Sequence, residues 1–408
     1  MKTCISVVMP LFNKQGFVLQ AVNSVLKQKE VELELLIIDD GSTDKSLEIV
    51  NSIDDPRIRI YRQNNLGPSA ARNRGLKEAK YPLIAFLDGD DFWAPAKLIN
   101  QALYLNAHPE FAAIYCQALR VDVTGKLIFR KPFGYGIRDE DFLLKNLVNK
   151  PVSPALGSTL MIKSEILKKM GGFDEALVNG EDTDLELRLA QAGFKQHMLT
   201  KPMAFIRFDA SSLSHSFDEE RWSVSYRSHV LIYEKLLNNH PPEISEDQAR
   251  VKVLNVHLRQ FLYYLLVGEL EGARILRIRI KDDQRLLDKN SRDFYTQIEF
   301  FTPLIFNNYG WPELSKFIDQ VLAERSHFMP NSENAIQDEL ARIKAIVWCA
   351  GQTRSSFKFQ AWRFLISACG KNFRLIMNKN FWKQAARLLI GDLAIWFNIK
   401  WQKLLMRF

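Results

Sequence analysis

The stretch YPLIAFLDGDDFW, residues 81–93, decides the fold because it places an apolar run directly before three carboxylates, Asp88, Asp90 and Asp91. A short apolar run bounded by turn residues is typical of a strand buried on both faces. Carboxylates at the end of such a strand cost desolvation energy unless they stay hydrated, pair with a cation or bind a metal. This stretch therefore predicts a central strand that leads into an acidic turn.

The same alternation of apolar runs and helical segments extends over residues 1–120. We expect strands at residues 4–9, 33–39, 57–62 and 83–88, and helices at about 15–28, 43–52 and 69–79. Strands separated by helices of this length indicate right-handed crossovers and a mostly parallel sheet. Such sheets bind ligands at the carboxyl ends of their strands. The polar clusters of this region fall at those ends, at residues 11–14, 39–40 and 88–91.

Residues 110–207 predict the second half of the same sheet. The expected strands are 111–116, 126–130, 158–163 and 197–208, and the expected helices are 164–170 and 182–192. Beyond Ser216 helical periodicity takes over, for example in residues 250–280 and 333–350. Because 408 residues exceed the roughly 250–300 at which a single core stops growing, we expect several domains. They are an α/β domain at 1–215, a mainly α-helical domain at 216–350 and a helical tail at 351–408.

The bulk composition, with 47% hydrophobic and 25% charged residues, is that of an ordinary globular protein. No CxxC pair occurs among the four cysteines, which indicates idle thiols in a reducing compartment; they are Cys4, Cys116, Cys349 and Cys369. The N-terminus lacks a signal-peptide cleavage site. No stretch approaches the roughly 18 apolar residues that cross a bilayer. We expect a cytoplasmic protein.

The tail, residues 351–408, carries the basic character of the chain. It holds eleven Lys or Arg and one acid, Asp392, so its net charge of +10 exceeds the +8 of the whole chain. It also contains Trp362, Trp382, Trp396 and Trp401. Basic helices with Trp can lie on an anionic membrane, here the inner face of the plasma membrane. Internal packing or an oligomer interface is a second interpretation, and nucleic-acid binding, for which no recognised motif is present, is a third.

The Asp88–Asp90 pair has two interpretations from the residues alone. Hard divalent ions such as Mg²⁺ or Mn²⁺ are held by one or two carboxylates together with substrate phosphates. The alternative is an acidic turn in which Asp91 caps the helix expected over residues 93–105.

Five ordered segments carry a resemblance to a known family: residues 6–28, 33–46, 66–91, 158–175 and 180–194. They read SVVMPLFNKQGFVLQAVNSVLKQ, LELLIIDDGSTDKS, LGPSAARNRGLKEAKYPLIAFLDGDD, STLMIKSEILKKMGGFDE and GEDTDLELRLAQAGF. The chain resembles the family 2 glycosyltransferases, inverting enzymes of GT-A fold that use nucleotide diphosphate sugars. The resemblance covers roughly residues 4–215.

The resemblance implies a nucleoside pocket at the first two strand ends. Pro10 and Phe12 would line the base, Asp40 would accept a hydrogen bond from it with Asp39 behind, and Arg72 would contact the donor. An acceptor-only carboxylate suits the imide N–H of uracil, and the guanidinium fork suits anionic oxygens. Asn13 is an additional candidate at the same strand end.

Two of these candidates have a structural alternative in the sequence itself. Residues 40–43 also read as a turn that leads to a helix N-cap. Arg72 also reads as a surface arginine of a helix.

The resemblance assigns Asp88, Gly89 and Asp90 to the donor diphosphate, with Asp88 and Asp90 as ligands of Mn²⁺ or Mg²⁺. The ion would stabilise the charge on the leaving nucleotide diphosphate as a Lewis acid. Asp91 is a further candidate in the same turn.

The catalytic base matches Asp182, beside Glu181, at the start of a predicted helix. Transfer to a hydroxyl needs a group that takes its proton, and a helix N-terminus favours the ionised carboxylate. Ordinary acidic residues in a first helical turn would look the same from the sequence. Asp209 and His215 are further candidates, because the segment around them resembles one in which many family members carry a histidine near the diphosphate.

The leading hypothesis is a metal-dependent inverting glycosyltransferase that uses a UDP-sugar and builds a surface or secreted glycan on a glycan or lipid-linked acceptor. A catalytically degenerate scaffold at a membrane and a nucleotidyltransferase are the alternatives. An aspartyl-phosphate phosphatase is disfavoured because its motif would follow the first strand and continue with Gly-Thr. Oligomerisation stays open, and no nucleic acid is expected as a partner.

Overall fold

The computed structural model describes residues 3–128, 132, 157–208, 219–240, 244–282, 314 and 316–322. The chain divides into two compact units, residues 1–253 and 254–408. Asp209, His215 and the basic tail lie outside the described residues, so their roles stay predictions, as do the domain boundaries at residues 215 and 350.

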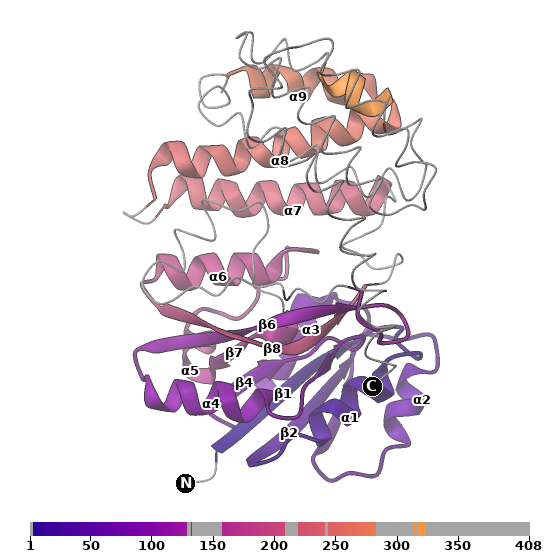
Figure 1. Cartoon of the computed structure of the whole chain (residues 1–408), viewed down its shortest axis with the longest axis vertical. Coiled ribbons are helices and arrows are strands. Elements are labelled where there is room, and N and C mark those ends of the chain that lie inside the picture. Colours follow the sequence, from indigo (N-terminus) through magenta and orange to yellow (C-terminus); the bar gives the residue numbers. More distant parts are fainter. Residues whose placement is uncertain are drawn as a thin grey trace, which may run out of the picture. The chain divides into compact units, whose positions relative to one another are not determined.

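The first half of the sheet follows the predicted alternation (Figure 1). Its strands are β1 (Thr3–Leu11), β2 (Val31–Asp39), β3 (Ile58–Arg62) and β4 (Leu83–Phe86). Its helices are α1 (Val18–Leu26), α2 (Ser46–Asn51) and α3 (Pro68–Glu78). β1 pairs in parallel with both β2 and β4, and β2 pairs in parallel with β3. Four parallel strands joined by three helices therefore build this half, as the sequence predicts.

The second half adds strands of both directions. In chain order it contains β5 (Phe92–Trp93), α4 (Lys97–Ala107), β6 (Phe111–Val121), a 3₁₀ turn (Gly157–Thr159), β7 (Met161–Lys163), α5 (Ser164–Lys169), α6 (Glu181–Gln191) and β8 (Lys195–Arg207). The strand order is β3-β2-β1-β4-β7-β6-β8-β5. β7 is antiparallel to both β4 and β6, while β6 and β8 are parallel. β6 and β8 consequently run in the same direction as β1, so their carboxyl ends lie at the same edge of the sheet.

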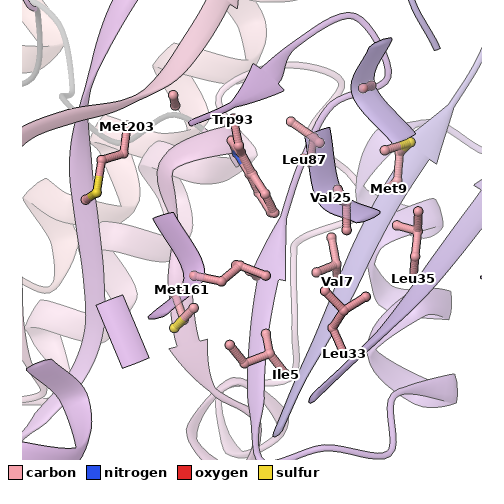
Figure 2. Close-up of a cluster of buried hydrophobic side chains, with 14 of the residues drawn as sticks. Ile5, Val7, Met9, Val25, Leu33, Leu35, Leu87, Trp93, Met161 and Met203 are labelled. Carbon is pink, nitrogen blue, oxygen red and sulfur yellow. The ribbon is translucent and has the colours of Figure 1, made fainter. Parts of the chain in front are cut away.

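The central strands are buried on both faces, as their continuous apolar runs predict. One core contains Ile5, Val7 and Met9 of β1, and Figure 2 shows these side chains with neighbours that include Val25, Leu33, Leu35, Leu87 and Trp93. A second core contains Val8 of β1 with side chains from α3, α5 and α6. The two cores take alternate residues of the same strand because side chains point to opposite faces with a period of two.

α3 packs against β1 with no room for a side chain at Gly75. A Cβ at this position would lie 2.2 Å from Cγ1 of Val8. Glycine is therefore required where helix and strand approach most closely. This contact fixes the helix that carries Arg72.

The residues beyond the sheet are helical where the structure describes them. They form α7 (Glu219–Asn238), α8 (Glu246–Val267) and α9 (Leu270–Asp282), and the two-unit division falls within α8. Gly268, with φ of +79°, separates α8 from α9 in a conformation that favours glycine. None of the helices in these described segments is both long and apolar enough to cross a membrane.

One predicted strand is shorter in the structure, and another is described only in part. Of residues 126–130, only 126–128 are described, and they contribute a single bridge between Leu127 and Val121. Residues 158–159 belong to the 3₁₀ turn, so β7 begins at Met161. The turn at residues 157–160 therefore delays the start of β7, whereas residues 126–128 pair in antiparallel fashion with the end of β6 through the hydrogen bonds from Asp122 N–H to Lys126 O and from Ile128 N–H to Arg120 O.

Candidate active site

One edge of the sheet gathers most of the predicted site residues. The carboxyl ends of β1, β2 and β4 lead to residues 12–15, 40–46 and 87–91, and β8 ends at Arg207 on the same edge. The antiparallel β7 starts there, so the preceding Ser158 also reaches this edge. Loops that the sequence separates by more than a hundred residues therefore meet at one place.

Arg72 of α3 joins the two acidic segments of the site. Its Nη2 donates to Oδ1 of Asp88 over 2.7 Å, and its Nη1 donates to Oε1 of Glu181 over 2.5 Å. The residue is only 4% exposed, which excludes the surface-arginine interpretation. Burial by itself lowers the pKa of the guanidinium, but the charges of Asp88 and Glu181 raise it above its usual value. Arg72 is thus a permanent cation between both acids.

Asp182 lies in the first turn of α6, directly after Glu181. Its Oδ1 accepts from the backbone N–H of Thr183 over 2.7 Å. Burial, and next the negative charge of Glu181, raise the pKa of Asp182 to about 7, although Arg72 and the Thr183 hydrogen bond oppose the rise. The helix N-terminus, which was expected to favour the ionised form, does not keep the pKa of Asp182 low. Desolvation outweighs the helix terminus here.

Asp90 is held by Lys14, which follows β1, and by Arg207, the last residue of β8. Its Oδ2 lies 2.5 Å from Nζ of Lys14, which follows β1. Its backbone oxygen accepts from Nε of Arg207 over 2.8 Å. Arg207 also donates to the carbonyl oxygens of Asp122 and Val123. Arg207 therefore fixes the backbone of the acidic turn to the loop after β6.

Asp91 has a structural role rather than a capping one. α4 starts at Lys97 with Ala96 as its N-cap residue, so Asp91 does not cap it. Its Oδ2 accepts from Oγ of Ser158 over 2.6 Å, and its Oδ1 accepts from the N–H of Arg207 over 2.9 Å. Burial, together with the charges of Asp90 and Asp88, raises the pKa of Asp91 well above its usual value.

Asp40 accepts hydrogen bonds from the chain itself. Its Oδ1 accepts from Nε2 of Gln63 and from the N–H of Leu66, and its Oδ2 accepts from the N–H of Gly67, over 2.7–2.9 Å. The carboxylate is 4% exposed and ties the end of β2 to the loop before α3. Oδ1 already accepts two hydrogen bonds, whereas Oδ2 accepts one and has a second acceptor site; the predicted contact to a base stays a prediction. α2 begins at Ser46 with Lys45 as N-cap residue, so residues 40–43 do not cap it.

Asp39 and Asn13 support the same corner. Asp39 is fully buried, accepts from the N–H of Ser42 and lies 3.3 Å from Nε of Arg62. Asn13 adopts φ of +51°, and its side-chain oxygen accepts from the N–H of Thr43 over 2.8 Å. Both side chains thus order the loop between β2 and α2, and contact with a donor stays a prediction for each.

Pro10, Phe12 and Gly89 line the edge beside these residues. Phe12 is 40% exposed, which leaves an aromatic ring accessible at the end of β1. A Cβ at Gly89 would lie 3.1 Å from Cδ1 of Leu11 and 3.5 Å from the carbonyl oxygen of Pro10. The acidic turn therefore packs directly on the end of β1.

Carboxylate oxygens, which are ligands of the kind that divalent cations prefer, gather at this edge of the sheet. Asp88, Asp90, Glu181 and Asp182 contribute carboxylates, while Lys14 and Arg72 contribute the positive charges that neutralise them in part. The Asp88 side chain is 34% exposed and that of Asp90 is 19% exposed. No group of three His, Cys, Asp or Glu side chains with metal-binding geometry occurs in the described segments. Two carboxylates with substrate phosphates would complete such a site.

Lys14, Ser158 and Arg207 are site residues that the sequence analysis did not select. Lys14 follows the first predicted strand, and Arg207 lies near the end of the last one. Because parallel sheets bind ligands at the carboxyl ends of their strands, this position indicates both residues. Ser158 precedes an antiparallel strand, whose direction the sequence pattern does not reveal.

Known proteins match the N-terminal half of the chain. The family model described as glycosyl transferase family 2 matches residues 6–171. A Haemophilus influenzae protein named an uncharacterized glycosyltransferase is 45% identical over 104 residues, 25% of this chain and 42% of that protein. The chondroitin synthase of Pasteurella multocida is 28% identical over 196 residues, 48% of this chain and 20% of that protein. The chain therefore spans less than half the length of either relative.

A solved structure agrees with this match. The crystal structure of S. aureus TarS 1-349 in complex with UDP-GlcNAc has a TM-score of 0.51 and 19% identity, and the alignment covers 80% of this chain and 91% of that one. The likeness confirms the expected GT-A fold followed by a helical region. Residues 6–171 are therefore similar in sequence to glycosyl transferase family 2.

Proposed function

We propose that the protein is an inverting glycosyltransferase that moves a sugar from a nucleotide diphosphate donor, a UDP-sugar above all, to a hydroxyl group. The observation that carries the proposal is the Arg72 bridge, because it joins Asp88 of the acidic turn to Glu181 beside Asp182. A donor-side acid and a candidate base are thereby held in one cluster. The named chondroitin synthase and the UDP-GlcNAc complex of TarS support a nucleotide-sugar donor and a glycan acceptor.

Asp182 is suited to act as the base. Its oxygen would take the proton of the acceptor hydroxyl while the hydroxyl oxygen forms a bond to the anomeric carbon of the donor sugar. The bond between that carbon and the diphosphate oxygen breaks on the opposite face, so the configuration inverts. A pKa of about 7 matches a general base that works near neutral pH.

Asp88 and Asp90 would hold Mn²⁺ or Mg²⁺. When bound, the ion supplies Lewis-acid stabilisation of the negative charge on the departing nucleotide diphosphate. Arg72 keeps the Asp88 carboxylate oriented through its 2.7 Å hydrogen bond. Lys14, 2.5 Å from Asp90, places a second cation where phosphate oxygens would lie.

The nucleoside of the donor would lie at the ends of β1 and β2. The accessible ring of Phe12 can stack on a base, and Oδ2 of Asp40, which accepts one hydrogen bond from the chain, can also receive the imide N–H of uracil. The acceptor would be a growing surface glycan or a lipid-linked sugar, with residues 351–408 as the contact to an anionic membrane.

A donor-binding screen tests the proposal. Isothermal titration of the full chain with UDP, GDP and dTDP in Mn²⁺ should show metal-dependent binding of UDP, and mass spectrometry with UDP-sugars should identify the sugar that is transferred. Asp90→Asn should weaken UDP binding at least about tenfold. Binding with no transfer to any acceptor would favour the scaffold alternative, and the absence of metal-dependent nucleotide binding would contradict the proposal.

A further inference from the structure

One face of α7 contacts α6 along its length. Near the start of α6, Nδ2 of Asn179 donates to Oγ of Ser225 over 3.1 Å. At the other end, Nε2 of Gln191 donates to the carbonyl oxygen of Asn239, just past α7, over 2.6 Å. Figure 1 shows the two helices running side by side. α7 therefore restrains the helix whose first turn contains Asp182.

At Gly180 the backbone that begins α6 lies directly against side chains of α7. It is the N-cap residue of α6 with φ of +81°, and it directly precedes Glu181. A Cβ at Gly180 would lie 2.9 Å from Cδ1 of Ile232 and 3.6 Å from Nε2 of His229. Because Ile232 is 1% exposed, it cannot move aside into solvent. The side chains of α7 thus define where the backbone of α6 begins.

Lys235 of α7 joins the preceding loop to the first turn of α6. Its Nζ lies 2.6 Å from Oδ2 of Asp174 and 3.3 Å from Oδ1 of Asp184. Asp184 is 2% exposed and its other oxygen pairs with Arg188 over 2.6 Å. Lys235 therefore prevents repulsion between two acids and ties both to α7.

We propose that α7 is a positioning element for the base, in which Lys235 and Ile232 hold the start of α6 so that Asp182 faces the acceptor hydroxyl. The inference rests on the proposed function and extends it, because α7 lies beyond residues 6–171, where the family model matches. Lys235 and Ile232 act through the backbone of residues 174–184 and touch no reacting atom in this scheme.

Substitution of Lys235 in the full chain tests the proposal. Lys235→Met should lower kcat at least about tenfold, since an error near 1 Å at a reacting group can cost about a hundredfold. The KM for the donor and the Kd for UDP should stay within about twofold of wild type. Lys235→Arg, which keeps a cation of similar length, should restore most of kcat. Arg227→Met, a change of an exposed cation on the same helix, is the matched control and should leave both constants unchanged.

A pair of glycine substitutions tests the contact with Ile232. Gly180→Ala and Gly193→Ala both place alanine in a left-handed conformation, at φ of +81° and +76°. Only Gly180→Ala brings a Cβ against another side chain, because nothing lies within 4 Å of the position at Gly193. Gly180→Ala should lower kcat more than Gly193→Ala by at least about threefold, with equal UDP affinity.

Hydrogen exchange gives a readout that does not need activity. Amides of residues 176–184 should exchange at least about tenfold faster in Lys235→Met than in wild type, while those of β1 and β2 stay unchanged. Wild-type kcat in Lys235→Met, or equal losses of kcat and UDP binding that arginine does not rescue, would overturn the inference. A wild-type protein that transfers no sugar would instead overturn the proposed function, and unchanged exchange in Lys235→Met would still overturn the positioning role.

Discussion

Asp40 and Asp182 are two carboxylates of the candidate site, and their surroundings differ in kind. Asp40 receives hydrogen bonds from Gln63, Leu66 and Gly67. Asp182 accepts from Thr183 and lies beside a second acid, Glu181. Donors stabilise the charged form of a carboxylate, whereas burial next to like charge destabilises it.

The difference separates a structural acid from a chemical one. Asp40 uses its two side-chain oxygens as hydrogen-bond acceptors that order the loop leading to α3, so its removal should affect the fold. Asp182 has a pKa of about 7 and can exchange a proton at neutral pH, so its removal should affect the reaction. Substitutions at the two positions test whether the two carboxylates differ in this way.

The largest effect is expected from Asp182→Asn. Loss of a general base should lower kcat by about 10²–10⁴-fold, with UDP affinity within about twofold of wild type. Because the pKa of Asp182 is raised in the folded state, its ionisation lowers stability as the pH rises through about 7. The melting temperature at pH 8 should therefore not fall. Asp54→Asn, at an exposed position between α2 and β3, is the control, and full activity of Asp182→Asn would remove the base assignment.

The pH profile of wild type should show the next largest effect. Below the pKa of about 7, Asp182 is protonated and cannot accept a proton, so kcat should fall about tenfold per pH unit. Above that pH it should level off. Initial rates at saturating donor between pH 5 and 8.5 measure this limb. If kcat stays constant between pH 5 and 7, the ionisation of Asp182 does not control the reaction.

Asp40→Ala should have the smallest effect on the reaction. It should also have the largest effect on stability. This change removes the acceptor of the part-buried N–H groups of Leu66 and Gly67, at a cost of about 0.5–1.5 kcal/mol for each hydrogen bond. Thermal unfolding should show a lower midpoint than wild type and than the control Asp54→Ala. Weaker UDP binding should accompany it. A midpoint equal to that of the control would show that Asp40 does not order this loop.

Much of the fold could be predicted because its signals are local. The apolar runs of β1, β2 and β4 are short, uninterrupted and separated by helical segments, so their parallel arrangement follows from patterning. Because residues 39–40 and 88–91 follow parallel strands, the sequence also places them at one edge of the sheet. The prediction fails at the start of β7, where a 3₁₀ turn occupies residues that periodicity alone assigns to the strand.

The sequence by itself determined the α/β order, the acidic turn after β4 and the residue types available for chemistry, because these depend on neighbours within a few positions. Only the tertiary structure decided that Arg72 bridges Asp88 and Glu181, that Arg207 anchors the acidic turn, and that Asp182 titrates near pH 7. Those properties depend on burial and on charges brought together from more than a hundred residues away. No local pattern encodes them.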